Sequence, residues 1–372
     1  MTTASQRMPL IDALKAIASQ LIVLHHLASY GPLAEAGREL LPGAMGWLFE
    51  YARMAVQVFL VIGGFLAIRG LSPNGEALAG SPLPLLWKRY LRLSIPFLAA
   101  IALAIIGSAI ADHWLDDDAI PARATLGQWL AHATLLHGIL GVESLSAGVW
   151  YIAIDFQLFA LTALLLWAGR KRLLAPALVL VTGITSLFWF NRDAGWDNWA
   201  VYFFGSYALG AAAWWAGDRR QYSVWLSVIL TVTIAALLVD FRLRITLALS
   251  IALLLGFSRR NGWLERFPEI APLPWLGRIS YSVFLIHFPV LLLANAVIAQ
   301  FSELSNIGTV TALLLTWAAS IAAGAVFYRL IESPAASQRI AAAIGSLLAT
   351  TQTFGRKLSS LKPLRAVRGR LP

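Results

Sequence analysis

The stretch that decides the fold runs from Leu10 to Tyr30 and reads LIDALKAIASQLIVLHHLASY. It is long enough and apolar enough to cross a bilayer as a single helix. The polar side chains of interest inside it belong to Asp12, Lys15, Ser19 and His26. A charged group at the centre of a membrane span costs about 2.5–3.5 kcal/mol on insertion scales, so such residues usually face a protein interior or a wet cavity. The pattern therefore predicts a membrane helix with one polar face.

His26 is the candidate general base on that face. At about 100° and 1.5 Å per residue, Lys15 and His26 lie on one side of the helix, about 16 Å apart along its axis. His25 points about 80° to the other side. A histidine whose pKa is near neutrality can accept a proton from a hydroxyl group. Two simpler interpretations stay open, in which Lys15 snorkels to the cytoplasmic edge and the histidine only bridges helices.

Composition extends the membrane interpretation to the whole chain, for which we expect an all-α polytopic bundle. Of the 372 residues, 59% are hydrophobic and 13% are charged, and the mean hydropathy is +0.70. Soluble domains carry about 25% charged residues. Ten spans are expected, at 10–29, 47–68, 91–111, 147–168, 174–190, 199–216, 222–239, 243–257, 275–299 and 306–330. The eighth is short and close to its neighbour, so eight or nine spans remain an alternative.

Charge asymmetry sets the predicted orientation. Most of the 29 Lys and Arg residues fall in the termini and in the even-numbered loops, which places both termini in the cytoplasm. We therefore assign the net charge of +10 to cytoplasmic loops, and we expect no nucleic-acid partner. The first span is interpreted as retained and not as a signal peptide. The expected location is the inner (plasma) membrane, as a multi-pass protein.

Two parts are expected along the chain. Residues 1–334 form the membrane domain, and residues 335–372 form a basic cytoplasmic tail. The tail either lies on the anionic leaflet, with which basic segments associate, or is a disordered solubilising segment. The sequence contains no Cys, which excludes disulfides, thiol nucleophiles and cysteine-ligated metals.

Other polar residues recur inside or beside the apolar segments. In WKRYLRLSIP, Arg89 and Arg92 share a helix face, where they either anchor the helix on the cytoplasmic side or bind phosphate. In GVWYIAIDFQLF, the carboxylate of Asp155 needs a partner, which can be Lys15, His26 or the substrate. The segments LGRISYSVFLIHFPV and YRLIESP add the candidates Tyr281, His287 and Glu332.

Taken in order, these segments resemble the acyltransferase 3 family of integral membrane acyltransferases. The family's opening Asp-Gly-Leu-Arg-like segment and its following histidine correspond to IDALK and His26. The basic R-x-x-R-x-x-x-P segment corresponds to WKRYLRLSIP. The remaining matches are Phe59–Phe65, Trp150–Phe159, Ile279–Val290 and Ile331–Pro334. Each motif alone is weak, but six in register, spanning residues 7–334, make the resemblance specific.

The chain departs from the family pattern at a few positions. Lys15 stands where the family has arginine, and Asp155 stands where it has glutamate. Both changes preserve charge, although Lys15 loses the bidentate geometry of a guanidinium group. Gly63 replaces a serine and Phe284 replaces a tyrosine. We interpret the chain as a divergent but active branch.

The resemblance implies transfer of an acyl group, typically acetyl, to a hydroxyl of a cell-surface glycan or its lipid-linked precursor. Acyl-CoA is the implied donor substrate, with no permanently bound cofactor and no metal. The implied site has His26 as base, Asp155 holding its tautomer, and Lys15 beside them, while Arg89 and Arg92 attract the CoA phosphates. Partners would be acyl-CoA, the acceptor, membrane lipids and, as an option, a separate acceptor-handling protein.

Several alternatives remain open at this point. A transporter or flippase could use the Lys15–His26 face as a proton or substrate path. A structural membrane subunit could use its polar residues only to bridge helices. Within the enzyme class, the acceptor could instead be a lipid or a small molecule. An acyl-histidine intermediate and direct transfer both fit the sequence.

Overall fold

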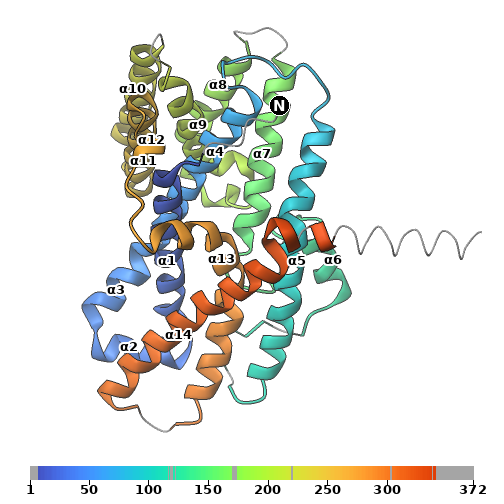
Figure 1. Cartoon of the computed structure of the whole chain (residues 1–372), viewed down its shortest axis with the longest axis vertical. Coiled ribbons are helices and arrows are strands. Elements are labelled where there is room, and N and C mark those ends of the chain that lie inside the picture. Colours follow the sequence, from blue (N-terminus) through green and yellow to red (C-terminus); the bar gives the residue numbers. More distant parts are fainter. Residues whose placement is uncertain are drawn as a thin grey trace, which may run out of the picture.

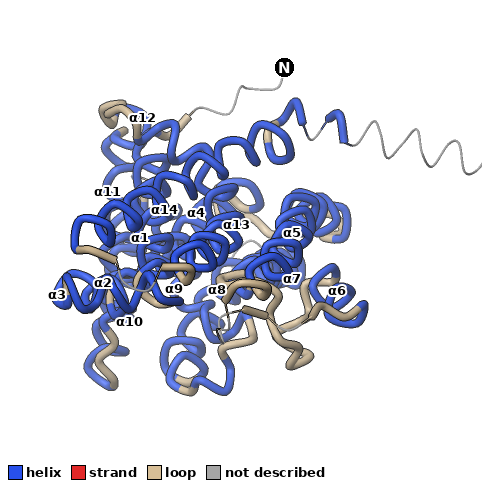
Figure 2. The backbone as a smooth tube through the Cα atoms, turned by 90° about the horizontal axis from the view of Figure 1, so that it is seen from below, coloured by secondary structure: helices blue, strands red, loops and turns tan. Residues whose placement is uncertain are grey.

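The computed structural model describes residues 7–115, 117, 120–121, 123–169, 174–218, 221–301, 304–336 and 338–340. Every regular element among these residues is helical, as Figure 2 shows. The principal helices are α1 (Pro9–Leu27), α2 (Gly31–Leu40), α3 (Pro42–Glu50), α4 (Val56–Leu71), α5 (Leu83–Ala111), α6 (Leu126–Ala133), α7 (Trp150–Ala168), α8 (Leu174–Phe188), α9 (Ala200–Ala216), α10 (Tyr222–Val239), α11 (Leu243–Asn261), α12 (Trp263–Arg266), α13 (Leu273–Ile298) and α14 (Asn306–Phe327). A π-helical turn, Tyr328–Glu332, follows α14. Most of the predicted basic tail, from residue 341 onward, lies outside the described residues.

Eight helical segments of the described chain are long and apolar enough to cross a membrane. They are Pro9–Leu27, Pro42–Leu71, Leu83–Ala111, Trp150–Ala168, Leu174–Arg192, Tyr222–Val239, Leu273–Ile298 and Asn306–Ala336. The predicted class, a polytopic helical membrane bundle, is confirmed. The other two expected spans correspond to α9, with 17 residues, and α11. The number ten and the orientation of the bundle stay predictions.

Helix α9 forms the centre of one half of the bundle. It is buried along almost its whole length and packs against α4, α8, α10 and α11. Lipid tails are as apolar as leucine, so membrane helices associate mainly by close packing of small residues. A Cβ on Gly64 of α4 would meet the carbonyl of Tyr207, and one on Gly210 of α9 would meet the carbonyl of Val61. The two glycines thus allow the backbones of α4 and α9 to touch.

The pairing of α1 with α13 positions the candidate site. The two helices make the most extensive contact in the described structure, and Gly277 of α13 lies against the carbonyl of Asp12. Any side chain at Gly277 would separate the helices, because even a Cβ would overlap that carbonyl. Helix α14 packs on α13 and runs obliquely across the lower half of the view in Figure 1. This arrangement brings the polar face of α1 against the middle of α13.

Candidate active site

One cavity of the described structure has a volume of about 870 Å³. It falls within the range of about 300–1,000 Å³ that is typical of small-molecule sites. Its wall combines the end of α1, the start of α4, the start of α7 and the middle of α13 with the connections before α7, α9 and α11. Those connections are the loops that charge asymmetry assigns to the extracytoplasmic side. The cavity therefore opens toward the side opposite the predicted basic loops.

A pair of buried histidines joins α1 to α13, and one of them, His26, lines this cavity. The Nδ1 atom of His26 is 2.7 Å from Nε2 of His287, and Nδ1 of His287 is 2.7 Å from the carbonyl oxygen of Phe284. The two rings are nearly coplanar, at 12°, with centroids 4.8 Å apart. This is the edge-to-edge arrangement of an N–H···N hydrogen bond. The expected candidate His287 is thus the direct partner of His26.

The hydrogen-bond chain assigns the protons of both rings. A carbonyl oxygen only accepts, so Nδ1 of His287 carries a hydrogen and donates to Phe284. In neutral His287 the Nε2 atom then accepts, and Nδ1 of His26 donates to it. Neutral His26 therefore has its lone pair on Nε2, which no described residue occupies with a hydrogen bond. Because the other nitrogen of a histidine sets which one is basic, this arrangement makes Nε2 of His26 the proton acceptor.

Close packing fixes the ring of His26. Tyr30 lies beside it with ring centroids 5.6 Å apart, and Gly148 also packs close to it. Gly148 has φ +78°, and a Cβ there would be 3.2 Å from Phe284 and 3.5 Å from Cε1 of His26. The positive φ favours glycine here, and a Cβ would also crowd the ring of Phe284. His25 also lines the cavity, but its Nδ1 atom is bound to the carbonyl of Leu48 at 3.2 Å.

Asp155 lies deeper in the bundle and is paired with Arg89. A guanidinium nitrogen of Arg89 donates to the carboxylate at 2.5 Å, and the same guanidinium lies 5.3 Å from the ring of Phe159. The side chain of Asp155 is 9% exposed and that of Arg89 is 26% exposed. Arg89, and neither Lys15 nor His26, is thus the partner of Asp155. The expectation that Asp155 holds the tautomer of His26 is wrong, because His287 makes that contact.

A second polar group gathers around Lys15 toward the opposite end of α1. The charges that act most strongly on Lys15 are those of Asp12, Glu332 and Arg92. Glu332 also accepts a hydrogen bond of 2.5 Å from Ser282 of α13. Arg92 is exposed, unlike Arg89 one helical turn earlier. Arg89 and Arg92 therefore do not act as one pair: the first belongs to the interior and the second to the neighbourhood of Lys15.

The remaining predicted candidates have local bonding partners. Ser19 is buried and donates to the carbonyl of Ala16 within α1. The hydroxyl of Tyr281 donates to the carbonyl of Leu93, which ties α13 to α5. Asp12 forms an ion pair of 3.2 Å with Arg7. These contacts give the residues structural roles, and none of them lines the large cavity.

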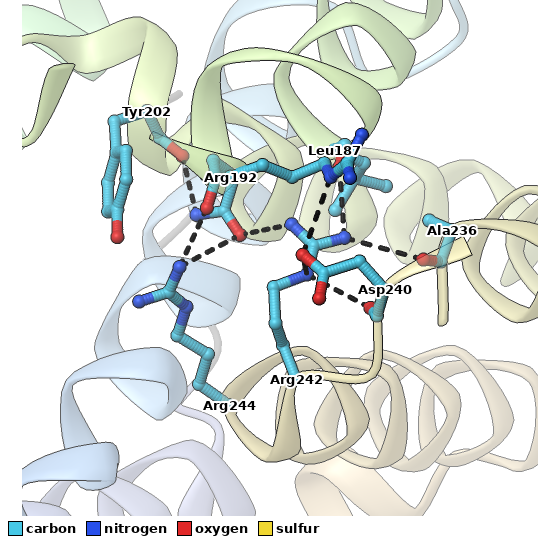
Figure 3. Close-up of polar contacts among 8 residues, drawn as sticks. Leu187, Arg192, Tyr202, Ala236, Asp240, Arg242 and Arg244 are labelled. Atoms are coloured by element: carbon cyan, nitrogen blue, oxygen red, sulfur yellow. Dashed lines mark hydrogen bonds and ion pairs between the residues drawn. The ribbon is translucent and has the colours of Figure 1, made fainter. Parts of the chain in front are cut away.

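Sequence analysis missed a group of arginines at the mouth of the cavity, of which Arg192, Arg242 and Arg244 are drawn in Figure 3. Its members that line the cavity are Arg53, Arg192, Arg242 and Arg244. Arg53 and Arg244 fall inside the expected spans 47–68 and 243–257, and Arg192 and Arg242 fall in loops otherwise poor in basic residues. Their positions were the available signal, because basic residues that depart from the predicted charge asymmetry need a local reason. No group of three or more His, Cys, Asp or Glu able to hold a metal occurs within the described residues.

The fold and the site together define a polytopic helical membrane protein in which one histidine of a hydrogen-bonded pair lines a cavity. The family model described as an acyltransferase domain matches residues 9–329, and the chain belongs to this family. Over 369 residues it is 22% identical to the peptidoglycan O-acetyltransferase OatA of Listeria monocytogenes, in a match covering 88% of this chain and 55% of that protein. The chain thus spans about half the length of this relative. No solved structure matches.

Proposed function

We propose that the protein transfers an acyl group, typically acetyl, from acyl-CoA to a hydroxyl of a cell-envelope glycan or its lipid-linked precursor, in the inner membrane. The observation that carries the proposal is the bonded chain from His26 through His287 to Phe284, which leaves Nε2 of His26 as a base at the cavity. Membership of the acyltransferase family and similarity to a peptidoglycan O-acetyltransferase support the reaction and the class of acceptor.

In this mechanism Nε2 of His26 takes the proton of the acceptor hydroxyl as its oxygen attacks the thioester carbonyl. The new ester bond forms, the carbon–sulfur bond breaks, and the departing thiolate receives the proton from His26. His287 stabilises the transient imidazolium because its Nε2 atom accepts a hydrogen bond from Nδ1 of His26. General-base catalysis of this kind contributes about 10²–10⁴ in rate.

We propose that the donor binds from the end of α1 that carries Lys15. Lys15 and Arg92 supply positive charge there, and phosphate groups are favourable partners for both side chains. The eleven-residue separation along α1 corresponds to about 16 Å between the Cα atoms of Lys15 and His26. The flexible pantetheine arm, which joins the phosphates of CoA to its thioester, would bridge this distance.

The first test measures acyl transfer by purified protein reconstituted in lipid. His26→Ala should lower transfer by at least 10²-fold, because the base is lost. His113→Ala is the matched control, since His113 is exposed and lies outside the cavity. His25→Ala should retain most of the activity, because the hydrogen-bonded chain that prepares the base runs through His26 and His287 and does not include His25. Full activity of His26→Ala would refute the assignment and favour the transporter or structural alternatives.

The second test separates the donor site from the base. S-acetyl-N-acetylcysteamine carries the thioester but lacks the phosphates of acetyl-CoA. Arg92→Met and Lys15→Met should raise the KM for acetyl-CoA and leave the rate with the truncated donor unchanged, whereas His26→Ala should impair both donors. Equal loss with the two donors in Arg92→Met would show that Arg92 does not bind phosphate.

A further inference from the structure

The mouth of the cavity contains more positive charge than its acidic residues neutralise. Arg192 and Arg242 share one carboxylate, that of Asp240, at 3.5 Å and 3.4 Å. Arg242 is also held by the carbonyl of Leu187 and the side chain of Asn191, at 3.0 Å and 2.7 Å. These contacts make Arg242 and Asp240 a rigid framework, visible in Figure 3. The other two arginines of the cavity wall, Arg53 and Arg244, do not share this carboxylate.

Arg244 lies next to this framework and forms no ion pair with a carboxylate of the described residues. One guanidinium nitrogen donates to the carbonyl of Asn191 at 2.7 Å, and the group lies 5.1 Å from the ring of Tyr202. Its Nε atom is buried and has no hydrogen-bond partner. Within the described part of the chain, no carboxylate lies within ion-pair distance of Arg244 or of Arg53. A buried donor left unsatisfied costs about 1–3 kcal/mol, and more when it is charged.

The position of Arg244 in its helix adds to this cost. Helix α11 begins at Leu243, and its first turn contains no acidic residue. The N-terminus of a helix carries about half a positive charge, so acidic side chains or anions are favoured there and cations are not. Arg242 and Arg244 therefore add positive charge where the helix is already positive. Such an arrangement is expected where an anion completes the site.

We propose that this mouth binds an acidic group of the acceptor, a carboxylate or a phosphate, while an acceptor hydroxyl lies at His26. The inference rests on the proposed function, because it names the substrate class of the same cavity. The Nε–H and Nη1 of Arg244 have no hydrogen-bond partner among the described residues, and each can donate to an oxygen of a carboxylate or phosphate. A carboxylate would belong to an acidic sugar of the glycan, and a phosphate to the link between sugar and lipid carrier. Neutral sugars would lack this contact.

The test measures binding of three probes of similar size to the full-length protein in detergent: glucuronate, glucose 1-phosphate and glucose. Wild-type protein should bind at least one acidic probe about tenfold or more tightly than glucose, which corresponds to one charge-assisted contact. Raising the salt concentration should weaken binding of the acidic probe and leave that of glucose unchanged. The preferred acid identifies the source of the group, carboxylate or phosphate.

Arginine variants show which residues cause the preference for the acidic probe. Arg244→Gln should remove most of the preference for the acidic probe, and Arg53→Gln should reduce it without touching the Arg242 framework. Arg38→Gln is the matched control, because Arg38 is an exposed arginine of α2 outside the cavity. Equal affinity for acidic and neutral probes, or no measurable binding of either acid, would overturn the proposal. So would an acid preference that persists in both Arg244→Gln and Arg53→Gln.

The probe-binding test can fail or succeed independently of the acyl-transfer test of the proposed function. His26→Ala should lose acyl transfer but keep the preference for the acidic probe, because the base does not contact the acid. Loss of transfer without any acid preference would mean a neutral acceptor and leave the acyltransferase proposal intact. Acid preference together with full transfer by His26→Ala would retain the anion site and refute the catalytic assignment.

Discussion

Replacing His287 tests whether the hydrogen bond between the two histidines prepares the base. In His287→Phe the ring remains, but the acceptor for Nδ1 of His26 and the donor to Phe284 are both lost. A neutral hydrogen bond contributes about 0.5–1.5 kcal/mol net. That energy corresponds to a bias of about two- to twelvefold toward the tautomer with a basic Nε2. Because Tyr30 and Gly148 still pack against the ring, the loss is limited to this bias.

We therefore expect kcat for His287→Phe to fall by about two- to twelvefold, with little change in KM for either substrate. This is a smaller loss than the 10²–10⁴ expected when the base itself is removed. His287→Gln should recover part of the rate, because its amide oxygen can take the place of Nε2 as acceptor. The assay is steady-state acyl transfer by reconstituted protein at matched protein levels.

Thermal melts of the same variants control for packing. A structural role alone would lower the rates of the Phe and Gln variants in proportion to their loss of stability. Wild-type kcat in His287→Phe would refute the relay, and so would equal kcat values in the Phe and Gln variants. Either result would mean that His26 finds its tautomer without His287.

Three further predictions follow from other contacts. Asp155→Leu should destabilise the protein by about 3–5 kcal/mol, because it leaves Arg89 inside the bundle without its partner. Adding Arg89→Met should restore most of the lost stability. Melting-temperature shifts that simply add in the double variant would contradict this coupling. Gly148→Ala should lower kcat, because its Cβ would press on Phe284 and His26 at a positive φ, and full activity would show that the loop adjusts. Burial lowers the pKa of His137 to about 4, so the fold favours the neutral form of this histidine. The unfolded chain takes up a proton more readily, so stability should fall as the pH is lowered from about 6.5 to 4. Its two ring nitrogens are buried and unbonded, so His137→Phe should flatten that pH dependence of the melting temperature, and an unchanged profile would assign it elsewhere.

The sequence was sufficient for the helices and for the polar face of α1. Span length, hydropathy and the eleven-residue spacing of Lys15 and His26 are local properties, and a helix translates them directly into geometry. The family motifs also selected His26 and His287 as candidates. The hydrogen bond between the two histidines could not be predicted from either segment alone, because it depends on how closely α1 approaches α13 at Gly277.

The partner of Asp155 was misassigned for a similar reason. Arg89 lies six residues into α5, and the charge pattern placed it at the cytoplasmic edge. Helix α5 is 29 residues long, more than a span requires, so residues near its start can still lie inside the bundle. The arginine therefore reaches Asp155, and no counting of loop charges would have indicated this. Helix length, and not residue type, decides whether a basic side chain anchors a span or enters it.

The described charges of the bundle divide into those that are neutralised and those that are not. Arg89 with Asp155, and Arg242 with Asp240, form pairs that hold helices and loops together. Arg244 has no such pair and lies at the cavity. Since an uncompensated charge in a membrane protein is costly, its retention points to a ligand of opposite sign. Under the proposed reaction, the phosphates of the donor would supply that charge at the Lys15 end of α1. The acidic group of the acceptor would supply negative charge to Arg244 at the cavity. Each substrate would therefore neutralise the basic residues at its own end of the site, with His26 between the two ends.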